Sequence, residues 1–289
     1  MNKRITIISF IALCIVISAH AQLLWKISGN GLTKPSYLFG THHLIEKDQI
    51  NGFDKILALS GQADAVVGEM DMSDPNLKAK MMQGGMMKDT TMKELLSPED
   101  YALADYDFKQ LMQVGLGQLG TMKPMLLDMI YSVMMYSKVM GLSKQPEGVD
   151  VLFQQNARAN NKKVIGLETI DQEIDVLFND IPLKRQAAIL MKDIKETQKD
   201  IDQLKALNVA YLAGDMAKAE ALSKEDDSMT PVEEKLMIDD RNARWMKELP
   251  ALMNDQSCFI DVGFMHLVGN NGLVSQLRKA GYTVTPMSL

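Results

Sequence analysis

Cysteine and histidine are both scarce in this chain of 289 residues, which has two cysteines and four histidines. Cys14 and His20 fall within the first 21 residues, which we expect to be removed. Cys258 would then be the last cysteine, which excludes an intramolecular disulfide in the mature protein. Any chemistry that requires an imidazole is restricted to the remaining histidines, His42, His43 and His266.

The chain also lacks an excess of positive charge. It has 31 basic and 37 acidic side chains, for a net charge of −6. Removal of Lys3 and Arg4 with the first 21 residues would change the net charge to −8. Because an acidic surface is repelled by nucleic acid and by anionic lipid, this charge argues against both as partners, and we expect no nucleic-acid binding.

Long apolar runs are absent after Ala21, so we predict no membrane span in the mature chain. The N-terminus has the three parts of a signal peptide: the basic "MNKR", the apolar "ITIISFIALCIVIS" and the small-residue site "AHA". The apolar run of about 14 residues is shorter than the roughly 20 that a membrane helix needs. We therefore predict cleavage at about Ala21 and an exported protein, periplasmic or secreted. A retained anchor is the alternative interpretation.

Strand-like runs are short and concentrate near the two ends of the chain. The helical segments between them begin at three cap signals, Ser97, Thr169 and Thr230. The charged, periodic stretch 182–213 predicts one long and largely solvated helix. The expected strands are "LLWKIS" and "SYLFG" from residues 23 and 36, "AVVGEMD" from 65, "KKVIGLET" from 162, "CFIDVGF" from 258 and "YTVTPM" from 282.

This distribution predicts an α/β fold, with α+β as the alternative. We expect a central mixed sheet built from both ends of the chain, and a helical middle region that caps it. Residues 22–289 would form a single domain, with a helical insertion at about residues 75–160.

Methionine is over-represented, with 23 in the chain and seven between Met70 and Met92. Three interpretations are open for this segment. Thioethers bind Cu(I) in exported proteins, and flexible methionines line adaptable grooves for peptide or lipid chains. They also fill irregular gaps in a hydrophobic core, and this third interpretation is the one we favour.

Four of the strand-like runs end in a similar way, with a glycine followed within three residues by an ionisable side chain. They read "FGTHH", "VVGE", "VIGLE" and "VGFMH". Because sites form at the carboxyl ends of the strands in open α/β sheets, parallel neighbours would bring these side chains to one edge. The side chains concerned are His43, Glu69, Glu168 and His266.

Two imidazoles and a carboxylate suit a divalent metal ion with one position open for water. Such an ion lowers the pKa of bound water and polarises a carbonyl, as peptide hydrolysis requires. In this hypothesis His43 and His266 bind the ion, and Glu69 completes the ligand set or acts as general base. Glu168 is a weaker candidate, because a carboxylate that precedes a capped helix is also stabilised by the helix dipole.

Structural roles compete with this hypothesis. A single histidine at a strand end is more often a hydrogen-bonded structural residue, but two similar motifs favour a joint function. His42 would point to the opposite face of the strand, so we leave it out. Arg241 lies at i, i+4 spacing between Met237 and Trp245. It either extends to solvent or points inward to stabilise an oxyanion or orient a carboxylate.

These residues resemble the TraB/PrgY/GumN family of exported and membrane proteins, which includes the animal Tiki proteases. The family has a G-x-x-H motif near each end and a glutamate between them, here Gly40–His43, Gly263–His266 and Glu69. His42 stands where the family often has an apolar residue. Further similar stretches are "KPMLLDM" from Lys123, "GVDVLF" from Gly148, "VIGLET" ending at Thr169, "RNARW" from Arg241 and "HLVGNNGLVSQLRKAGYTV" from His266.

The resemblance implies a fold shared with erythromycin-esterase-like and ChaN-like proteins. It also implies a metal or acid–base role for His43, His266 and Glu69, and a site role for Arg241. We therefore predict an exported, metal-dependent hydrolase of the peptidase type that uses Mn, Co or Zn and acts on a peptide or protein. Two alternatives remain: a non-enzymatic protein that sequesters a peptide, haem or iron, and a metal-free esterase with a histidine base.

Overall fold

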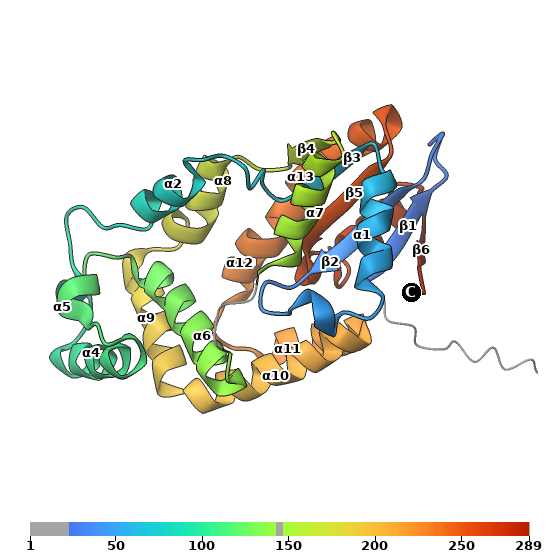
Figure 1. Ribbon diagram of the computed structural model, residues 1–289. Coiled ribbons are helices and arrows are strands. Elements are labelled where there is room, and N and C mark those ends of the chain that lie inside the picture. The colour runs from blue at the N-terminus through green and yellow to red at the C-terminus, as the bar shows by residue number, and fades with distance from the viewer. Residues whose placement is uncertain (1–22, 143–146, 289) are drawn as a thin grey trace, which may run out of the picture.

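A six-stranded mixed sheet is the centre of the protein. The computed structural model describes residues 23–142 and 147–288, so the predicted signal peptide, residues 1–21, lies outside the described residues. The strand order is β4-β3-β5-β2-β1-β6 (Figure 1). All six strand predictions are confirmed: β1 is Leu24–Ser28, β2 Ser36–Thr41, β3 Ala65–Gly68, β4 Lys163–Gly166, β5 Cys258–Gly263 and β6 Thr283–Pro286.

The four strands β4, β3, β5 and β2 run parallel to one another. Gly68 of β3 lies opposite Gly166 of β4 and Asp261 of β5, and Thr41 of β2 lies opposite Gly263 of β5. Strands β1 and β6 complete the sheet as antiparallel neighbours. Because the register is aligned at these positions, the carboxyl ends of the four parallel strands meet at one edge of the sheet. The fold is therefore α/β, with strands from both ends of the chain.

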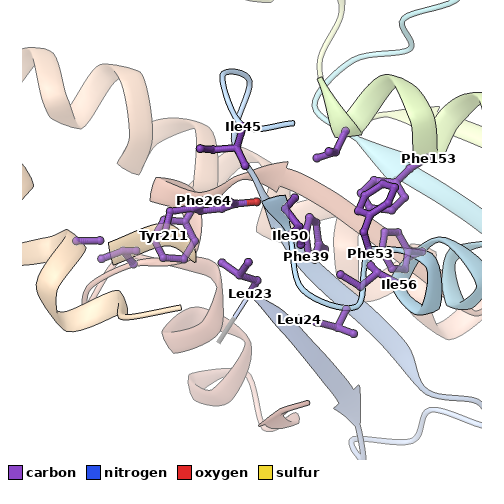
Figure 2. Packing of buried hydrophobic residues seen from close by; sticks show 14 of the residues in the cluster. Leu23, Leu24, Phe39, Ile45, Ile50, Phe53, Ile56, Phe153, Tyr211 and Phe264 are labelled. Carbon is purple, nitrogen blue, oxygen red and sulfur yellow. The ribbon is translucent and has the colours of Figure 1, made fainter. Parts of the chain in front are cut away.

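Helices cover both faces of the sheet. On one face α1 (Phe53–Gln62) and α7 (Val149–Ala159) pack on β2 and β5, around Phe39, Phe153 and Phe259 (Figures 1 and 2). The Phe153 ring lies 5.3 Å from Phe39 and 4.8 Å from Phe259. On the other face α13 (Asp240–Asp255) and α14 (Leu273–Lys279) bury Trp245 and Leu277. Because helices cover both faces of the sheet, its middle strands are apolar on both sides and show little alternation of apolar and polar residues.

Most of the chain between β3 and β5 is helical, and part of it extends away from the sheet as a helical arm, residues 77–140 and 170–195 (Figure 1). Its own core includes Phe108, Leu127 and Leu190. Its helices are α2 (Leu77–Gly84), α3 (Met92–Leu95), α4 (Pro98–Met112), α5 (Leu116–Leu119), α6 (Pro124–Met140), α8 (Ile170–Ile174), the π-turn η2 (Asp175–Asn179) and α9 (Leu183–Lys195).

Three further helices lead from the arm back to the sheet. They are α10 (Thr197–Ala213), α11 (Met216–Glu225) and α12 (Pro231–Glu234), which continues through the π-turn η3 (Lys235–Asp239) into α13. The three predicted caps are confirmed, since Ser97, Thr169 and Thr230 each accept a backbone N–H as the N-cap of a helix.

The prediction of one solvated helix at 182–213 is wrong. The stretch divides at Glu196 into α9 and α10. α9 buries an apolar face, including Ile189, Leu190 and Ile194, against the arm. Most of the charged side chains that suggested a solvated helix lie outside this apolar stripe, because a helix of the arm needs only one apolar face.

The methionine-rich segment contributes to the arm. Met87 and Met92 are buried in its core, whereas Met72 and Met82 are exposed. Core filling therefore accounts for part of this segment. Among the described residues, no helix is long and apolar enough to cross a membrane.

Candidate active site

The parallel strand ends bring the predicted side chains to one edge of the sheet. Glu69 directly follows β3, Glu168 follows β4 by two residues, His43 follows β2 by two, and His266 lies in the short turn η4 (Phe264–Leu267) after β5. Arg241, near the start of α13, reaches the same edge. Glu69, Glu168, Arg241 and His266 share one interaction network, and His43 lies at its margin.

Arg241 is the centre of this network, which we call the sheet-edge cluster: Glu69, Glu168, Glu173 and Arg241. Its Nη2 lies 2.7 Å from Glu69 Oε2, 2.6 Å from Glu168 Oε2 and 2.8 Å from Glu173 Oε2. The guanidinium also stands 5.1 Å from the centre of the Trp245 ring. Arg241 is 5% exposed, so it points inward and does not extend to solvent.

Charge in the sheet-edge cluster is balanced. Burial raises the pKa of Glu173 to about 8. The charge of Arg241 lowers this pKa and the charge of Glu69 raises it further, and Glu173 is protonated at pH 7. Glu168 is buried, but hydrogen bonds from Arg241 hold its pKa below the ordinary value. A second guanidinium, that of Arg244, binds the other Glu168 oxygen at 2.7 Å. Two guanidinium groups thus face two carboxylates and one neutral acid.

Glu69 is held in its ionised form. Its Oε1 accepts the N–H of Gly263 at 2.7 Å, and its Oε2 accepts Arg241. Burial alone would raise the pKa of Glu69, but His266, Arg241 and the Gly263 N–H outweigh it and the pKa is lowered. The side chain is 21% exposed, more than those of Glu168 and Glu173. Glu69 is therefore the carboxylate of the cluster that a ligand can best reach.

His266 is fixed in one tautomer by Asn242. The Asn242 Nδ2 donates to the carbonyls of His266 and Asn271, so its Oδ1 accepts from His266 Nδ1–H at 2.8 Å. Nε2 of His266 then carries a lone pair, with Arg241 Nη1 3.5 Å away. Burial lowers the pKa of His266 to about 4. At neutral pH the ring is an uncharged acceptor beside Glu69 and Arg241.

The two histidines of the first motif differ. The His43 side chain is 70% exposed, and its Nδ1 lies 3.7 Å from Asp150 Oδ2 of α7. His42 is half-buried, accepts the N–H of Leu44 at Nδ1 and packs at 5.2 Å on Tyr211. Burial, together with the charge of His43, lowers the pKa of His42 to about 4. His42 thus has a local structural role, and His43 faces the open edge.

Glycine at the head of each G-x-x-H motif permits close packing. A Cβ on Gly40 would lie 2.8 Å from Phe264 Cδ2 of the second motif, and one on Gly263 would lie 3.2 Å from Glu69 Oε1. Tyr211 also donates its hydroxyl to the Gly40 carbonyl at 3.0 Å. The two motifs, 223 residues apart in sequence, therefore pack directly on each other.

A comparison with known protein families gives a match that covers nearly the whole chain. The model of the TraB/PrgY/gumN family matches residues 23–286. The chain belongs to the TraB/PrgY/gumN family. No curated protein and no solved structure matches it at a significant level.

Several side chains of this TraB/PrgY/gumN site were not predicted from the sequence. Asn242 and Arg244 lie beside Arg241 in "RNARW", and Asp150 lies in "GVDVLF". Both stretches are similar to the family in sequence, but the spacing of Asn242, Arg244 and Asp150 did not indicate a role for them. Glu173 follows the Thr169 cap by four residues and returns to the site because α8 turns back toward Arg241.

Asp261 was also missed, and it is the least expected of these residues. It is 1% exposed in the middle of the sheet, and neither carboxyl oxygen has a hydrogen-bond partner within the described residues. Burial, then the charges of Asp150 and Glu69, raises its pKa well above the ordinary value. Asp261 is therefore a neutral acid close to the ionised Glu69.

Two π-turns adjoin the sheet-edge cluster. η2 follows the helix that carries Glu173, and η3 precedes the helix that carries Arg241. The two π-turns contact each other. A π-turn widens the helix by one residue per turn and often marks a functional site. Here η3 changes the register of the helix just before Arg241 enters the network.

The donor types at the sheet edge fit a divalent metal ion. A metal-bound imidazole normally donates its other N–H to a neighbouring group, as His266 does to Asn242. Glu69 is ionised and partly exposed. Within residues 23–142 and 147–288, however, no three His, Cys, Asp or Glu side chains are grouped as a ligand set, and His43 Nδ1 lies 3.7 Å from Asp150 Oδ2.

Proposed function

We propose that this protein is an exported hydrolase of the peptidase type, which attacks a carbonyl group at the edge of the sheet beside His266 and Glu69. The observation that carries the proposal is the fixed His266 tautomer. Asn242 holds Nδ1–H, so the Nε2 lone pair faces the space shared with Arg241 and an ionised, partly exposed glutamate. An acceptor held in this way is prepared to bind an electrophile.

The divalent ion of this hypothesis would be held by His43, His266 and Glu69. When bound, it would supply a water of lowered pKa and polarise the substrate carbonyl. His266 suits a ligand role better than a general-base role, since an imidazole with a pKa of about 4 gains little from accepting a proton. Glu69, with one oxygen on the Gly263 N–H, is the stronger candidate for the base.

Arg241 has two contributions in this proposal. Through Nη2 it fixes the three glutamates, and this orients Glu69. Its Nη1 has one long contact, at 3.5 Å to His266 Nε2, so this donor is available to an oxyanion that forms beside His266. Binding and orientation of the substrate carbonyl would thus depend on the Arg241 guanidinium, which is itself in contact with Glu69, Glu168, Glu173 and His266.

The first experiment combines metal content with peptide cleavage. The purified protein and its His43→Ala, His266→Ala and Glu69→Gln variants are dialysed against Mn²⁺, Co²⁺ or Zn²⁺, analysed for metal and incubated with a mixed peptide library. His42→Ala is the matched control, because His42 is adjacent but has a local role. We expect about one ion per chain in the wild type and control, less in both other histidine variants, and cleavage lowered roughly 10²-fold or more by Glu69→Gln.

The results also separate the alternatives. A specific observation favours the metal-free esterase as second candidate: His43 is paired with a carboxylate, that of Asp150. Ester cleavage that persists in chelator and is lost in Asp150→Asn would support it and contradict the metal hypothesis. Tight binding of a peptide or haem without turnover would instead support the sequestering protein.

A further inference from the structure

A second group of carboxylates lies between the helical arm and the sheet, outside the site described above. Asp128 of α6, Asp193 of α9 and Asp200 of α10 all line one cavity of about 340 Å³. We call these three residues the arm cluster. Its members come from three helices, so they meet only because the arm folds back through α10.

The arm cluster has acceptors without donors. Asp128 is 8% exposed and, as the neutral acid of the pair, shares a hydrogen bond with Asp193. Apart from that shared proton, Asp128 Oδ1, Asp193 Oδ1 and Asp200 Oδ2 have no donor among the described residues. None of the ion pairs within the described residues includes these three aspartates; the nearby Lys192 and Lys199 pair with Asp227 instead. Three enclosed oxygens thus face a cavity that supplies no positive charge.

The walls of the cavity are mostly apolar and reach the chain next to both histidine motifs. Met265, which precedes His266, lines this cavity. Leu44, which follows His43, lines a second cavity of about 230 Å³ that shares Asp193, Asp200 and Leu204 with the first. The remaining apolar lining of the first cavity includes Ile189, Leu207, Leu222 and Met229.

We propose that this cavity binds a primary alkylammonium group, with the ammonium against the arm cluster and the alkyl chain against the apolar wall. An ammonium has three N–H donors, which equals the number of these enclosed acceptor oxygens. A lysine side chain has the proposed chemistry.

The protonation of the cluster agrees with a missing cation. Burial and then Asp193 raise the pKa of Asp128 well above its ordinary value, and burial, with Asp193 and Asp226, raises that of Asp200 to about 6. Glu196 adds negative charge, and Lys199 opposes these effects. A bound ammonium would favour the ionised carboxylates and would release protons from the cluster.

For the proposed peptidase, this cavity would select a substrate with a lysine-like side chain next to the bond that is cleaved. This part rests on the proposed function, whereas ammonium binding does not. The arm cluster would then determine KM, and the sheet-edge cluster would determine kcat.

The test uses n-pentylamine as the probe and 1-pentanol as its neutral isostere, in calorimetric titrations of the whole protein at pH 7.5. We expect the amine to bind, the alcohol to bind at least about tenfold more weakly, and Asp128→Asn and Asp200→Asn to weaken amine binding about tenfold or more. Asp202→Asn removes an exposed charge of the same helix and should leave binding unchanged. Equal binding of amine and alcohol, or undiminished binding in both cluster variants, would overturn the proposal.

A second measurement addresses the substrate. Peptides that differ only by lysine or norleucine at one position are compared in cleavage by the wild type and Asp128→Asn. A higher KM with unchanged kcat for the lysine peptide alone would support substrate selection. If no peptide is cleaved, the proposed function fails while the amine titration still decides the binding site. If cleavage occurs without lysine preference, only the selectivity fails.

Discussion

The protein contains two carboxylate clusters that differ in how their charge is compensated. In the sheet-edge cluster, three glutamates surround the guanidinium of Arg241, and Arg244 adds a second positive charge. In the arm cluster, three aspartates line a cavity and have no cationic partner within the described residues. In the sheet-edge cluster the positive charge comes from arginine side chains of the protein itself. In the arm cluster we propose that it comes from a bound ligand. The sheet-edge cluster is also more deeply buried, since two of its three glutamates are buried and only one of the three aspartates is.

Loss of the internal cation should have the largest effect. Arg241→Met leaves Glu69 without a cationic partner and the buried Glu168 with Arg244 alone, so we expect the free energy of unfolding to fall by roughly 3–5 kcal/mol at pH 7. Urea unfolding measures the change. Arg158→Met is the control, since Arg158 pairs with Asp71 near the surface and should lose only about 0–1 kcal/mol. Equal losses in the two variants would mean that the guanidinium does not stabilise the sheet-edge cluster.

Packing should also differ between the two regions. Gly40→Ala places a Cβ 2.8 Å from Phe264 Cδ2, where both histidine motifs meet, and should cost about 1–3 kcal/mol. Gly117→Ala, in α5 of the arm, meets nothing within 4 Å and should stabilise by about 0.5 kcal/mol through the unfolded state. Thermal unfolding of both variants checks this contrast. A neutral Gly40→Ala would show that the motifs are less tightly packed than the structure implies.

In the arm cluster, removal of a charge should stabilise the protein. Its folded-state pKa of about 6 means that Asp200 binds more protons in the folded protein than in the unfolded chain between about pH 4 and 6. The free energy of unfolding therefore falls as the pH rises through this window.

Asp200→Asn should abolish this decrease in the free energy of unfolding. At pH 7.5 the variant should be more stable than the wild type by about 1 kcal/mol, a value reduced because Asp200 is partly exposed to solvent. Urea unfolding at pH 4.5 and pH 7.5 provides the measurement, with Asp202→Asn as the exposed control. The same fall in stability in wild type and Asp200→Asn would contradict the assignment.

The smallest change concerns a single proton of His266. With its pKa lowered to about 4, His266 should not titrate between pH 5 and 8 in chelator-treated protein. Asn242→Asp replaces the amide acceptor of Nδ1–H by a carboxylate, which favours the imidazolium and should raise this pKa by about 1–2 units. NMR of the histidine Cε1–H resonances measures the shift. Asn254→Asp, exposed on the same helix, should leave it unchanged.

Much of the fold could be predicted from local patterns. The six strands and the caps at Ser97, Thr169 and Thr230 all have short-range signals, since strand and cap preferences depend on neighbouring residues. The spacing of Arg241 left open whether its side chain points inward or to solvent. The division of 182–213 into two helices did not follow from pattern. A charged periodic stretch looks alike whether its apolar face meets an arm core or solvent.

The sequence by itself determined which residues end the strands, and with them the candidates His43, Glu69, Glu168 and His266. Only the tertiary structure decided that these strands are parallel neighbours, that Glu173 and Asn242 join the site, and that His43 lies toward Asp150. Only the fold, too, placed Asp128, Asp193 and Asp200 around one cavity. Local preferences are written in neighbouring residues, whereas contacts across many residues depend on strand order and on how helices return to the sheet.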